Sequence, residues 1–445
     1  MSILLNAYVL LFAAIFLGSI FSKVRIKGFA IGSAGVLFAG IAIGYVSLTL
    51  AGRITPDSSL YAQAQELIQN EIIPNQMTDI FMMIFICSVG LIAGKDLLGV
   101  MKKYGVKFIL LALVITLVGA AGTYGFTCLS KNHSTYEVSG VYTGALTSTS
   151  GLAVALETAA GHSWEEIRDF DIQSERKKEE IVFAVGQPSA AGFTQKQMDD
   201  YVKYACSGIG VGHTIGYPFG VIVVLLGVNL LPGILRIDLR KEKEEYEREF
   251  TLEGRNQDAG EKGSLVFNFV AFFLVMLVGY MLGMVPFPLP LIGKVNLGST
   301  GGILIAALCF GAKRRLGGIS FLMDVDFLNV LKDIGVAMTL SSVGLRYGHA
   351  VIEALLGSGW YLGAISIVIG LVALLVGCVI GRYCLHINWF LLSGAICGGM
   401  TSTPGLSAAI DSTGSNVPAV GYGATYPFAT IFMVIFTIVL RGLPV

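Results

Sequence analysis

The sequence predicts an all-α polytopic membrane protein with two inverted repeats, each made of about five transmembrane helices and a re-entrant helical hairpin. Three observations predict this fold: the composition, a phrase that occurs twice, and the distribution of Lys and Arg. Of the 445 residues, 54% are hydrophobic and only 13% are charged. Soluble domains carry about 25% charged residues, so most of this chain is expected to lie in a lipid bilayer.

Ten stretches of mostly apolar residues are long enough to cross a bilayer, which takes about 20 residues. They lie at 4–22, 28–48, 77–96, 106–128, 206–232, 264–284, 296–312, 327–346, 357–381 and 417–440. The first stretch has no basic residue before it, and the basic segment "SKVRIKG" follows it, which is the reverse of a cleavable signal. We therefore expect a first transmembrane helix whose amino end is outside.

Two polar segments interrupt this apolar pattern. A charged linker at 236–263 separates a first membrane repeat, 1–235, from a second, 264–445. A polar insertion at 162–204 falls inside the first repeat. We interpret the insertion as a small extramembrane decoration that faces solvent and contains a helix or two.

A hydroxyl-rich phrase occurs once in each half of the chain. "GALTSTSGLAVALETAAG" begins at residue 144 and "GGMTSTPGLSAAIDSTGS" at residue 398, an offset of 254 residues. The same offset joins "SVGL" at 88–91 to "SVGL" at 342–345, and a "YPF" block follows each phrase, at 217–219 and 426–428. Blocks that recur in the same order indicate that one unit was duplicated.

The distribution of Lys and Arg predicts that the second copy is inverted, because cytoplasmic loops carry an excess of these residues. Six crossings per half would place the linker and the basic cluster at 313–315 outside, whereas five crossings place both inside. The phrase would then return to its own side as a hairpin. Arms of about 10 residues span about 15 Å and reach the midplane of a 30 Å core. Two inverted hairpins that meet there are typical of secondary transporters.

The tip of each hairpin is expected to hold the start of a helix. Thr is a favoured N-cap and Pro is favoured at the first helical position, so Thr403 would cap a helix that begins at Pro404. By symmetry, Thr149 would cap a helix that begins at Ser150. The N–H groups of the next two residues in each copy would then face the tip unpaired.

Free N–H groups at a helix N-terminus favour carboxylates, so the expected partner is a small anionic solute. Alternatively, the small residues only allow close packing of helices. The predicted solute-binding residues of the tips are Thr147, Ser148, Thr149, Gly151, Thr401, Ser402, Thr403 and Gly405.

Charged residues add further candidates. Arg346 stands where the first half has Ile92, and either reaches toward the membrane surface or binds a solute carboxylate in this half alone. Glu157 aligns with Asp411, and these two are candidate sites for a coupling ion or proton, or else interfacial residues.

An acidic residue and a proline also recur in both halves. Asp79 aligns with Asp333, and we interpret both as interfacial helix caps. The prolines of the "YPF" blocks either unwind a span near the site or stand at the start of a helix.

Other classes of protein find no support. No Walker A, dinucleotide-binding, HExxH or nucleophile-elbow motif is present, so no enzyme is expected. The five His lack metal-ligand spacing and the seven Cys are odd in number, which predicts neither a metal nor a disulfide framework. The net charge is zero and no basic block is present, so no nucleic-acid partner is expected. No cofactor is expected either.

The paired phrases "GALTSTSGLAVALE" and "GGMTSTPGLSAAID", each followed by a "YPF" block, resemble the bacterial aspartate:alanine exchanger family of permeases. The resemblance implies an inner-membrane antiporter of acidic amino acids or dicarboxylates, without covalent chemistry. Many members carry a pair of soluble regulatory domains between the halves, and the linker here is too short for either domain. The alternatives are a cation- or proton-coupled symporter and an ion channel whose tips form the selectivity region. Whether the chain acts alone or as a homodimer is left open.

Overall fold

Most of the residues that the structure describes lie in helices. The computed structural model describes residues 5–23, 25–26, 29–30, 33–69, 72–94, 97–130, 134–189, 192–254, 266–289, 293–295, 297–357 and 359–443. Strands are confined there to short antiparallel ribbons, which pair Arg25–Ile26 (β1) with Phe29–Ala30 (β2), Phe287–Leu289 (β3) with Gly293–Val295 (β4), and Arg315–Leu316 (β5) with Ile319–Ser320 (β6).

Each of the ten predicted apolar stretches contains a helix. In the first half these are α1 (Ala7–Phe21), α2 (Ala34–Gly52), α4 (Asn75–Ala93), α5 (Leu97–Leu129) and α9 (Gln195–Ile234). In the second half they are α11 (Phe269–Met284), α12 (Gly298–Lys313), α13 (Val325–Leu356), α14 (Trp360–Val379) and α17 (Pro418–Gly442). Within the described ranges, 7 of these are long and apolar enough to cross a membrane, while α1, α11 and α12 are shorter. The prediction of an all-α polytopic membrane protein is confirmed.

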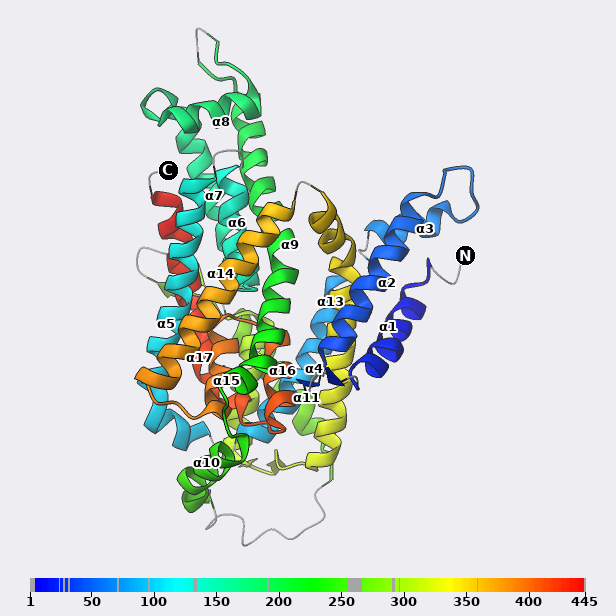
Figure 1. Cartoon of the computed structure of the whole chain (residues 1–445), viewed down its shortest axis with the longest axis vertical. Coiled ribbons are helices and arrows are strands. Elements are labelled where there is room, and N and C mark those ends of the chain that lie inside the picture. Colours follow the sequence, from blue (N-terminus) through cyan, green and yellow to red (C-terminus); the bar gives the residue numbers. More distant parts are fainter. Residues whose placement is uncertain are drawn as a thin grey trace.

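Two further helix pairs occupy the duplicated phrase. α6 (Thr135–Ala145) and α7 (Thr149–Arg168) form hairpin 1, and α15 (Trp389–Gly399) and α16 (Thr403–Thr413) form hairpin 2. Hairpin 1 lies toward the end of the molecule that carries α8 (Glu175–Val185), and hairpin 2 lies toward the end that carries α10 (Leu239–Gly254) (Figure 1). The hairpins therefore approach the middle of the molecule from opposite ends.

The helices pack as two bundles. One contains α1, α2, α4, α11, α12 and α13, and the other contains α5, α9, α14, α17 and both hairpins. The contacts come in matched pairs: α2 packs on α13 as α12 packs on α4, and α5 packs on α17 as α14 packs on α9. Each hairpin packs in the same way, because α6 lies on α9 and α15 lies on α17.

Glycines allow the hairpins to approach the long helices closely. A Cβ on Gly212 of α9 would overlap the backbone oxygen of Glu137 in α6, and a Cβ on Gly394 of α15 would overlap the backbone oxygen of Pro418 in α17. Small residues at such contacts are typical of helix packing in membranes. Packing therefore accounts for many of the glycines in the hairpin bundle.

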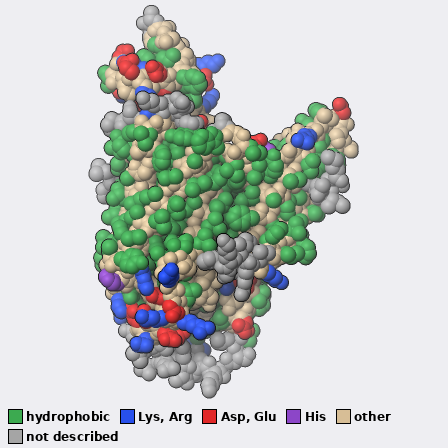
Figure 2. All heavy atoms as spheres, in the orientation of Figure 1, with side chains coloured by type: hydrophobic (Ala, Val, Ile, Leu, Met, Phe, Trp, Pro, Cys, Tyr) green, Lys and Arg blue, Asp and Glu red, His purple; other side chains and the backbone are tan. Residues whose placement is uncertain are grey.

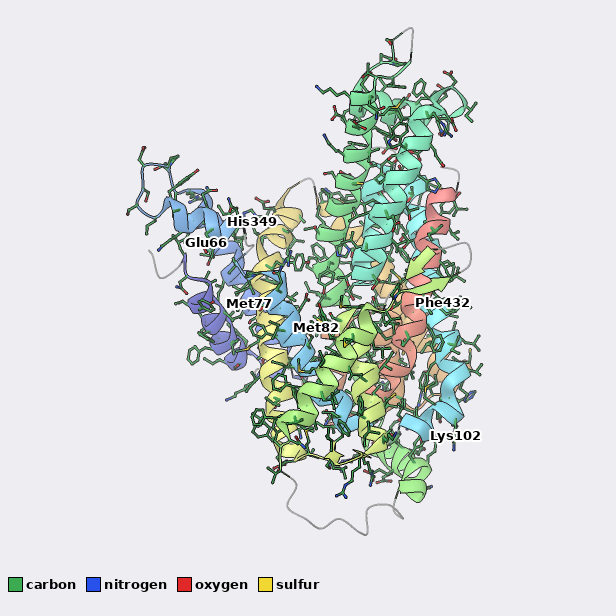
Figure 3. The ribbon with its side chains drawn as sticks, turned by 180° about the vertical axis from the view of Figure 1, so that it is seen from behind. Glu66, Met77, Met82, Lys102, His349 and Phe432 are labelled. Atoms are coloured by element: carbon green, nitrogen blue, oxygen red, sulfur yellow. The ribbon has the colours of Figure 1, made fainter. Side chains whose placement is uncertain are left out.

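The surface has the layout of a membrane protein. A broad band of hydrophobic side chains covers the middle of the face in Figure 2, and charged side chains gather beyond it at both ends. Lys102 lies toward the end of the molecule that carries α10, while Glu66 and His349 lie toward the opposite end of the molecule (Figure 3). The chain is a multi-pass membrane protein.

The two polar segments are folded elements. The insertion contains a 3₁₀ turn (Phe170–Ile172) and α8, and it is continuous with the ends of α7 and α9. It has a small core of its own, in which Ile167, Ile181 and Tyr201 pack with Tyr136 of hairpin 1. The insertion thus contains helices, as expected, and it also packs against hairpin 1. The linker forms α10, and its residues 255–263 lie outside the described ranges. A short helix, α3 (Tyr61–Gln69), precedes α4.

Candidate functional site

The tips of the two hairpins have the same backbone geometry. After α6, Thr147 N donates to Gly144 O at 2.8 Å and Ser148 N donates to Thr143 O at 2.7 Å. After α15, Thr401 N donates to Gly398 O at 3.0 Å and Ser402 N donates to Cys397 O at 2.8 Å. This pair of bonds defines a Schellman C-cap, which satisfies the last carbonyl groups of a helix.

Threonine holds the left-handed position in both turns. The φ angle is 52° at Thr147 and 50° at Thr401. Glycine is the usual residue there, and a β-branched side chain in this region is strained by on the order of 1–3 kcal/mol. A compensating contact is therefore expected for the threonine side chains.

That contact joins the two tips. Thr147 Oγ1 donates to the backbone oxygen of Met400 at 3.1 Å, and Thr401 Oγ1 donates to the backbone oxygen of Leu146 at 2.7 Å. Each threonine thus satisfies a carbonyl of the other hairpin. A glycine at either position would relieve the strain but would lose the bond between the tips.

The returning helices begin one residue earlier than predicted. Ser148 Oγ accepts the N–H of Gly151 at 3.1 Å, and Ser402 Oγ accepts the N–H of Gly405 at 3.2 Å. The serines are the caps, and the prediction that Thr149 and Thr403 cap these helices is wrong. Proline is tolerated in the first turn in general, so Pro404 did not fix the start to within one residue.

The position of the two serine caps determines which backbone N–H groups remain free at the tips. Those of Gly151 and Gly405 are taken by the caps, and those of Leu152 and Leu406 bond within their helices. An α-helix leaves its first N–H groups without an intrahelical acceptor, here those of Thr149 and Ser150 in α7. In α16 only Thr403 offers one, because Pro404 has no N–H.

A cavity of about 420 Å³ lies against both tips and between the two bundles. Met82 of α4, one of its lining residues, lies near the middle of the molecule in Figure 3. Six of the nine predicted solute-binding residues line it: Thr147, Ser148, Thr149, Thr401, Thr403 and Arg346. Gly151, Ser402 and Gly405 are buried behind the tips and are absent from its wall.

Arg346 lies in the cavity wall rather than at the membrane surface. It belongs to α13, and its guanidinium lies 5.5 Å from the centre of the Tyr347 ring. Tyr347 in turn packs on Tyr217 of α9, with ring centres 5.1 Å apart. The side chain therefore points toward the hairpin bundle, which favours the solute-binding interpretation over the surface one.

The sequence missed an acidic residue and a histidine in the same wall. Asp79 lies in the second turn of α4 and lines the cavity, so its interpretation as an interfacial cap is wrong. Its sequence counterpart Asp333 is exposed and lies 3.4 Å from Lys332. His213 of α9 also lines the cavity and bonds to Thr143 through Nδ1 at 3.0 Å. Asp79 lines the cavity because this part of α4 faces the hairpin tips, and no local sequence pattern encodes that packing.

Thr78 offers an unused hydroxyl to the cavity. Its side chain is buried, and Oγ1 has no hydrogen-bond partner among the described residues. Burying a hydroxyl without a partner costs free energy. A solute or water in the cavity would supply that partner.

The prolines of the "YPF" blocks lie inside long helices. Pro218 is in the middle of α9 and Pro427 is in the middle of α17, which excludes a helix start. Each proline removes one helical hydrogen bond, so the carbonyls of Thr214 and Gly423 lose their usual donors. Thr214, Tyr217 and Tyr426 line the cavity.

Glu157 and Asp411 lie away from the cavity wall. Glu157 is exposed in the middle of α7, so it does not end its helix as the interfacial interpretation required. Asp411 lies near the end of α16, where one carboxylate oxygen accepts the N–H of Ser33 at 3.1 Å. Ser33 precedes α2, which belongs to the other bundle.

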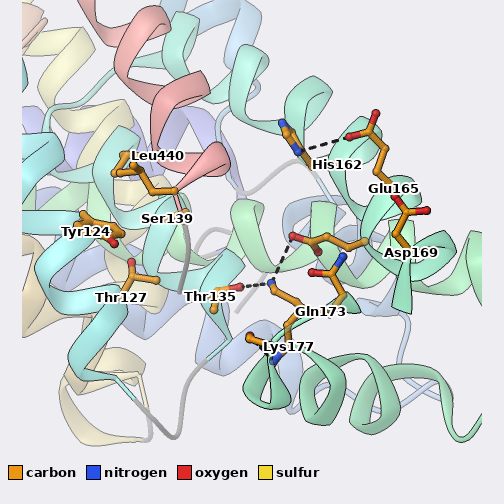
Figure 4. Close-up of a pocket in the computed structure, with 13 residues that line it drawn as sticks. Tyr124, Thr127, Thr135, Ser139, His162, Glu165, Asp169, Gln173, Lys177 and Leu440 are labelled. Atoms are coloured by element: carbon orange, nitrogen blue, oxygen red, sulfur yellow. Dashed lines mark hydrogen bonds and ion pairs between the residues drawn. The ribbon is translucent and has the colours of Figure 1, made fainter. Parts of the chain in front are cut away.

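A second cavity of about 420 Å³ lies between the insertion and the outer ends of α5, α6 and α17 (Figure 4). Its Lys177 is already paired with Glu166 at 3.5 Å, and the ring of His162 lies 3.9 Å from Glu165. None of the predicted solute-binding residues lines it. Within the described ranges, no group of three His, Cys, Asp or Glu could hold a metal ion.

Comparison with known proteins decides the family. A family described as "Predicted Permease Membrane Region", of the aspartate–alanine exchanger type, matches residues 10–233 and 271–442. The chain belongs to this permease family. The matched ranges cover both membrane halves and omit only the chain ends and the region of the linker.

Three relatives carry the name uncharacterized transporter. An uncharacterized transporter of Desulfotalea psychrophila is 22% identical over an alignment 548 positions long, gaps included, which covers 98% of this chain and 97% of the relative. An uncharacterized transporter of Bacteroides thetaiotaomicron is 34% identical over 174 residues, 37% of this chain and 32% of the relative. One of Rhodopirellula baltica is 36% identical over 142 residues, 32% of this chain and 27% of the relative. The last two alignments span about a third of those relatives' length.

Proposed function

We propose that this permease is a secondary antiporter that exchanges small carboxylate-bearing solutes by alternating access, at a site between the two hairpin tips. The observation that carries the proposal is that both tips and Arg346 line one cavity between the two bundles. Such a midplane site between inverted repeats is the general arrangement of secondary transporters. The matched packing of the two halves supports the inverted repeat.

A carboxylate has three kinds of donor in this cavity. Arg346 offers a planar fork that suits two carboxylate oxygens. The start of α7 offers the N–H groups of Thr149 and Ser150 at the positive end of a helix. The hydroxyl of Thr78 offers a further bond. Together these donors favour a carboxylate over a neutral solute.

Asp79 narrows the class of solute. Its carboxylate lies in the same wall as Arg346 and would repel a second carboxylate placed beside it. It would instead attract an ammonium group. An acidic amino acid, which carries both charges, therefore suits the cavity better than a dicarboxylate.

Asp411 supports a movement of one bundle against the other. Its bond to Ser33 joins hairpin 2 to α2 across the bundle boundary, and this contact must break if the bundles separate on the α10 side. "GSAG" at 32–35 matches "GSTG" at 298–301, so Ser299 is the counterpart of Ser33. Glu157 would then meet the N–H of Ser299 when the opposite side closes.

The orientation in the cell follows from the charge distribution. We place the protein in the inner membrane with its amino end outside and α10 in the cytoplasm, because Lys102, Lys103 and the basic cluster at 313–315 would then be cytoplasmic. The insertion, at the opposite end of the molecule, would face outward (Figure 1).

Counterflow tests exchange directly. Proteoliposomes loaded with unlabelled L-aspartate or succinate should take up the labelled solute faster than empty ones, whereas a channel shows no such stimulation. A thermal-shift screen with acidic amino acids, dicarboxylates and neutral amino acids identifies the solute, because a bound ligand stabilises the folded state. Binding of neutral amino acids alone would contradict the carboxylate class.

The tips are tested by removing one hydroxyl from each. Thr149→Val combined with Thr403→Val should abolish uptake while the protein still folds and inserts, because both residues line the cavity. Near-normal transport by the double variant would exclude the tips as the site. The matched control is Thr413→Val in α16, which is outside the cavity wall.

A coupled symporter is the second candidate, favoured by the carboxylates of Asp79 and Asp411 at helix positions within the bundles. Transport that ignores imposed pH and sodium gradients would exclude it. Exchange and coupling are therefore separable in the same proteoliposomes.

A further inference from the structure

The first arms of the two hairpins start with nearly the same backbone geometry. α6 follows Ser134, whose φ and ψ are −57° and 136°, and α15 follows Asn388, whose φ and ψ are −57° and 142°. Each cap side chain accepts the second N–H of its helix, from Tyr136 and Phe390 respectively. The first N–H of each helix therefore needs another acceptor.

In hairpin 1 that acceptor comes from the insertion. Thr135 N donates to Glu180 Oε1 of α8 at 3.1 Å, and Ser134 Oγ donates to the same oxygen at 2.7 Å. Lys177 Nζ lies 3.0 Å from Glu180 Oε2 and neutralises it. Burial opposes ionisation of Glu180, but Lys177 and the bonds from Ser134 and Thr135 outweigh it and lower its pKa.

In hairpin 2 the acceptor comes from the linker. Trp389 N donates to Glu242 Oε2 of α10 at 2.7 Å, and the side chain of Asn388 donates to the backbone oxygen of Glu242 at 2.8 Å. Arg382 donates to Glu242 Oε1 at 2.6 Å and neutralises it. Glu242 is buried, although the rest of its sequence neighbourhood is highly charged.

These two contacts are not copies of one another. Ser134 and Asn388 are 254 residues apart and therefore correspond in the duplication, but Glu180 lies in the insertion at 162–204, which the second repeat lacks. Glu242 precedes the second repeat. Two unrelated extramembrane segments therefore place a cation-paired carboxylate, buried in Glu242 and 10% exposed in Glu180, on equivalent backbone atoms.

The other end of each first arm is also fixed. Both arms are 11 residues long, about 16 Å, and end at the turns that are joined through Thr147 and Thr401. Each arm is thus held at its outer end by a carboxylate and at its inner end by the other hairpin. A carboxylate at the N-terminus also stabilises the helix through its dipole.

We propose that Glu180 and Glu242 are positioning residues of the transport site, which anchor the outer ends of α6 and α15 and so set where the two tips meet. The insertion and the linker helix then serve the same purpose on opposite sides of the membrane. This inference rests on the proposed function only in taking the tips as the solute site.

Hydrogen–deuterium exchange of the full chain in lipid nanodiscs tests the anchors without any solute. Glu180→Gln should raise exchange on the order of tenfold along the whole of α6 and through the tip at 146–151, because a charge-assisted bond is lost. Hairpin 2 should be unchanged. Glu242→Gln should have the converse effect, along α15 and through 400–405.

Exposed neighbours provide the matched controls. Glu179→Gln in α8 and Glu244→Gln in α10 remove a charge from the same helices without touching a hairpin. Both should leave exchange at the tips as in the wild type. If Glu180→Gln or Glu242→Gln raises exchange only in the first turn of its helix, the carboxylate is a local cap and the proposal is overturned.

A double variant separates positioning from stability. Glu180→Gln removes the nearer of the two carboxylates that pair with the buried ammonium of Lys177, and leaves only Glu166 at 3.5 Å. Adding Lys177→Met removes that ammonium, so part of the thermal stability lost in the single variant should return. The anchor is still missing, so the apparent KM for labelled L-aspartate or succinate should stay raised roughly threefold to tenfold with the maximal rate little changed. Recovery of KM together with stability would contradict a positioning role.

The two proposals fail in different ways. If the wild type carries neither solute, the proposed solute class fails, while hydrogen exchange still decides the anchors. If the wild type transports normally and both anchor variants have wild-type exchange and KM, the anchors fail and the proposed function stands.

Discussion

Hairpins 1 and 2 have the same tip but different surroundings. Both turns place threonine at a positive φ and serine at the cap. In α16, however, every residue of 403–410 is buried, whereas α7 buries a single stripe that includes Gly151, Ala155 and Ala159. Over 403–410 the returning helix of hairpin 2 is thus covered on all sides, whereas the returning helix of hairpin 1 has one exposed face.

The same difference appears in single side chains. Thr149 is exposed in the cavity, whereas its counterpart Thr403 is buried and its hydroxyl bonds to Tyr422 at 3.0 Å. Asp411 and Glu157 are both exposed, but Asp411 accepts a hydrogen bond from Ser33 in the other bundle. Two nearly identical phrases thus have different surroundings in one structure, as the alternating access that we propose would require.

The largest effect is expected at Arg346, whose counterpart in the first half is the uncharged Ile92. Arg346→Ala should weaken binding of the transported carboxylate roughly 10- to 100-fold, because a charge-assisted bidentate contact is lost. Arg346→Lys should be intermediate, since it keeps the charge but not the fork. Isothermal titration of the purified protein measures both.

Lys102→Ala is the control for that experiment, because Lys102 lies at the α10 end, far from the cavity (Figure 3). Wild-type affinity in Arg346→Ala would show that the two tips alone hold the solute. The two halves would then contribute nearly equally to solute binding.

The next effect concerns the contact that only hairpin 2 makes. Asp411→Asn should weaken its bond to Ser33 and open the α10 side, with on the order of a tenfold gain in labelling at Ser33→Cys, because a charged acceptor is replaced by a neutral one. Labelling by an impermeant maleimide in inside-out vesicles, on a background without native cysteines, measures it. The Ser33→Cys change keeps the backbone N–H that Asp411 binds.

Glu157→Gln is the matched variant in hairpin 1. It should leave this labelling unchanged, since Glu157 is exposed on the opposite side. Equal gains in both variants would mean that the two hairpins are already equivalent, against the difference described above.

The smallest effect concerns the difference at the second helical residue of each tip. Ser150→Pro should reduce solute affinity roughly three- to tenfold, because it removes one N–H and one hydroxyl that face the cavity, while proline is tolerated in the first turn. Pro404→Ser should change affinity less than twofold, since α16 is packed there. Uptake kinetics of the two exchanged variants, compared side by side, measure both. Equal losses would remove Ser150 as a source of asymmetry.

Much of the fold could be predicted from the sequence. All ten apolar stretches hold helices, because a chain in lipid must satisfy its backbone within each segment and the hydrophobic run then marks the helix. The hairpins followed from the duplication and from the charge of the loops. The cap was misplaced by one residue, because Ser and Thr both cap helices and adjacent tip residues compete for the role.

Less of the candidate site could be predicted. Arg346 was a candidate because it interrupts an apolar span, but Asp79 was taken as a surface residue because it lies near the start of one. Glu180 and Glu242 were not candidates at all. Their partners lie 45 and 147 residues away along the chain, and no periodicity joins them.

The sequence by itself determined the helices, the membrane class, the family and the shape of each tip, because hydrophobicity, backbone hydrogen bonding and turn chemistry act over a few residues. The tertiary structure alone decided how deeply each copy of the phrase is buried beside the cavity, which carboxylate bonds across the bundle boundary, and which extramembrane carboxylates bond to the hairpins. These are properties of how two bundles meet, and identical local sequences have different neighbours on the two sides of that boundary.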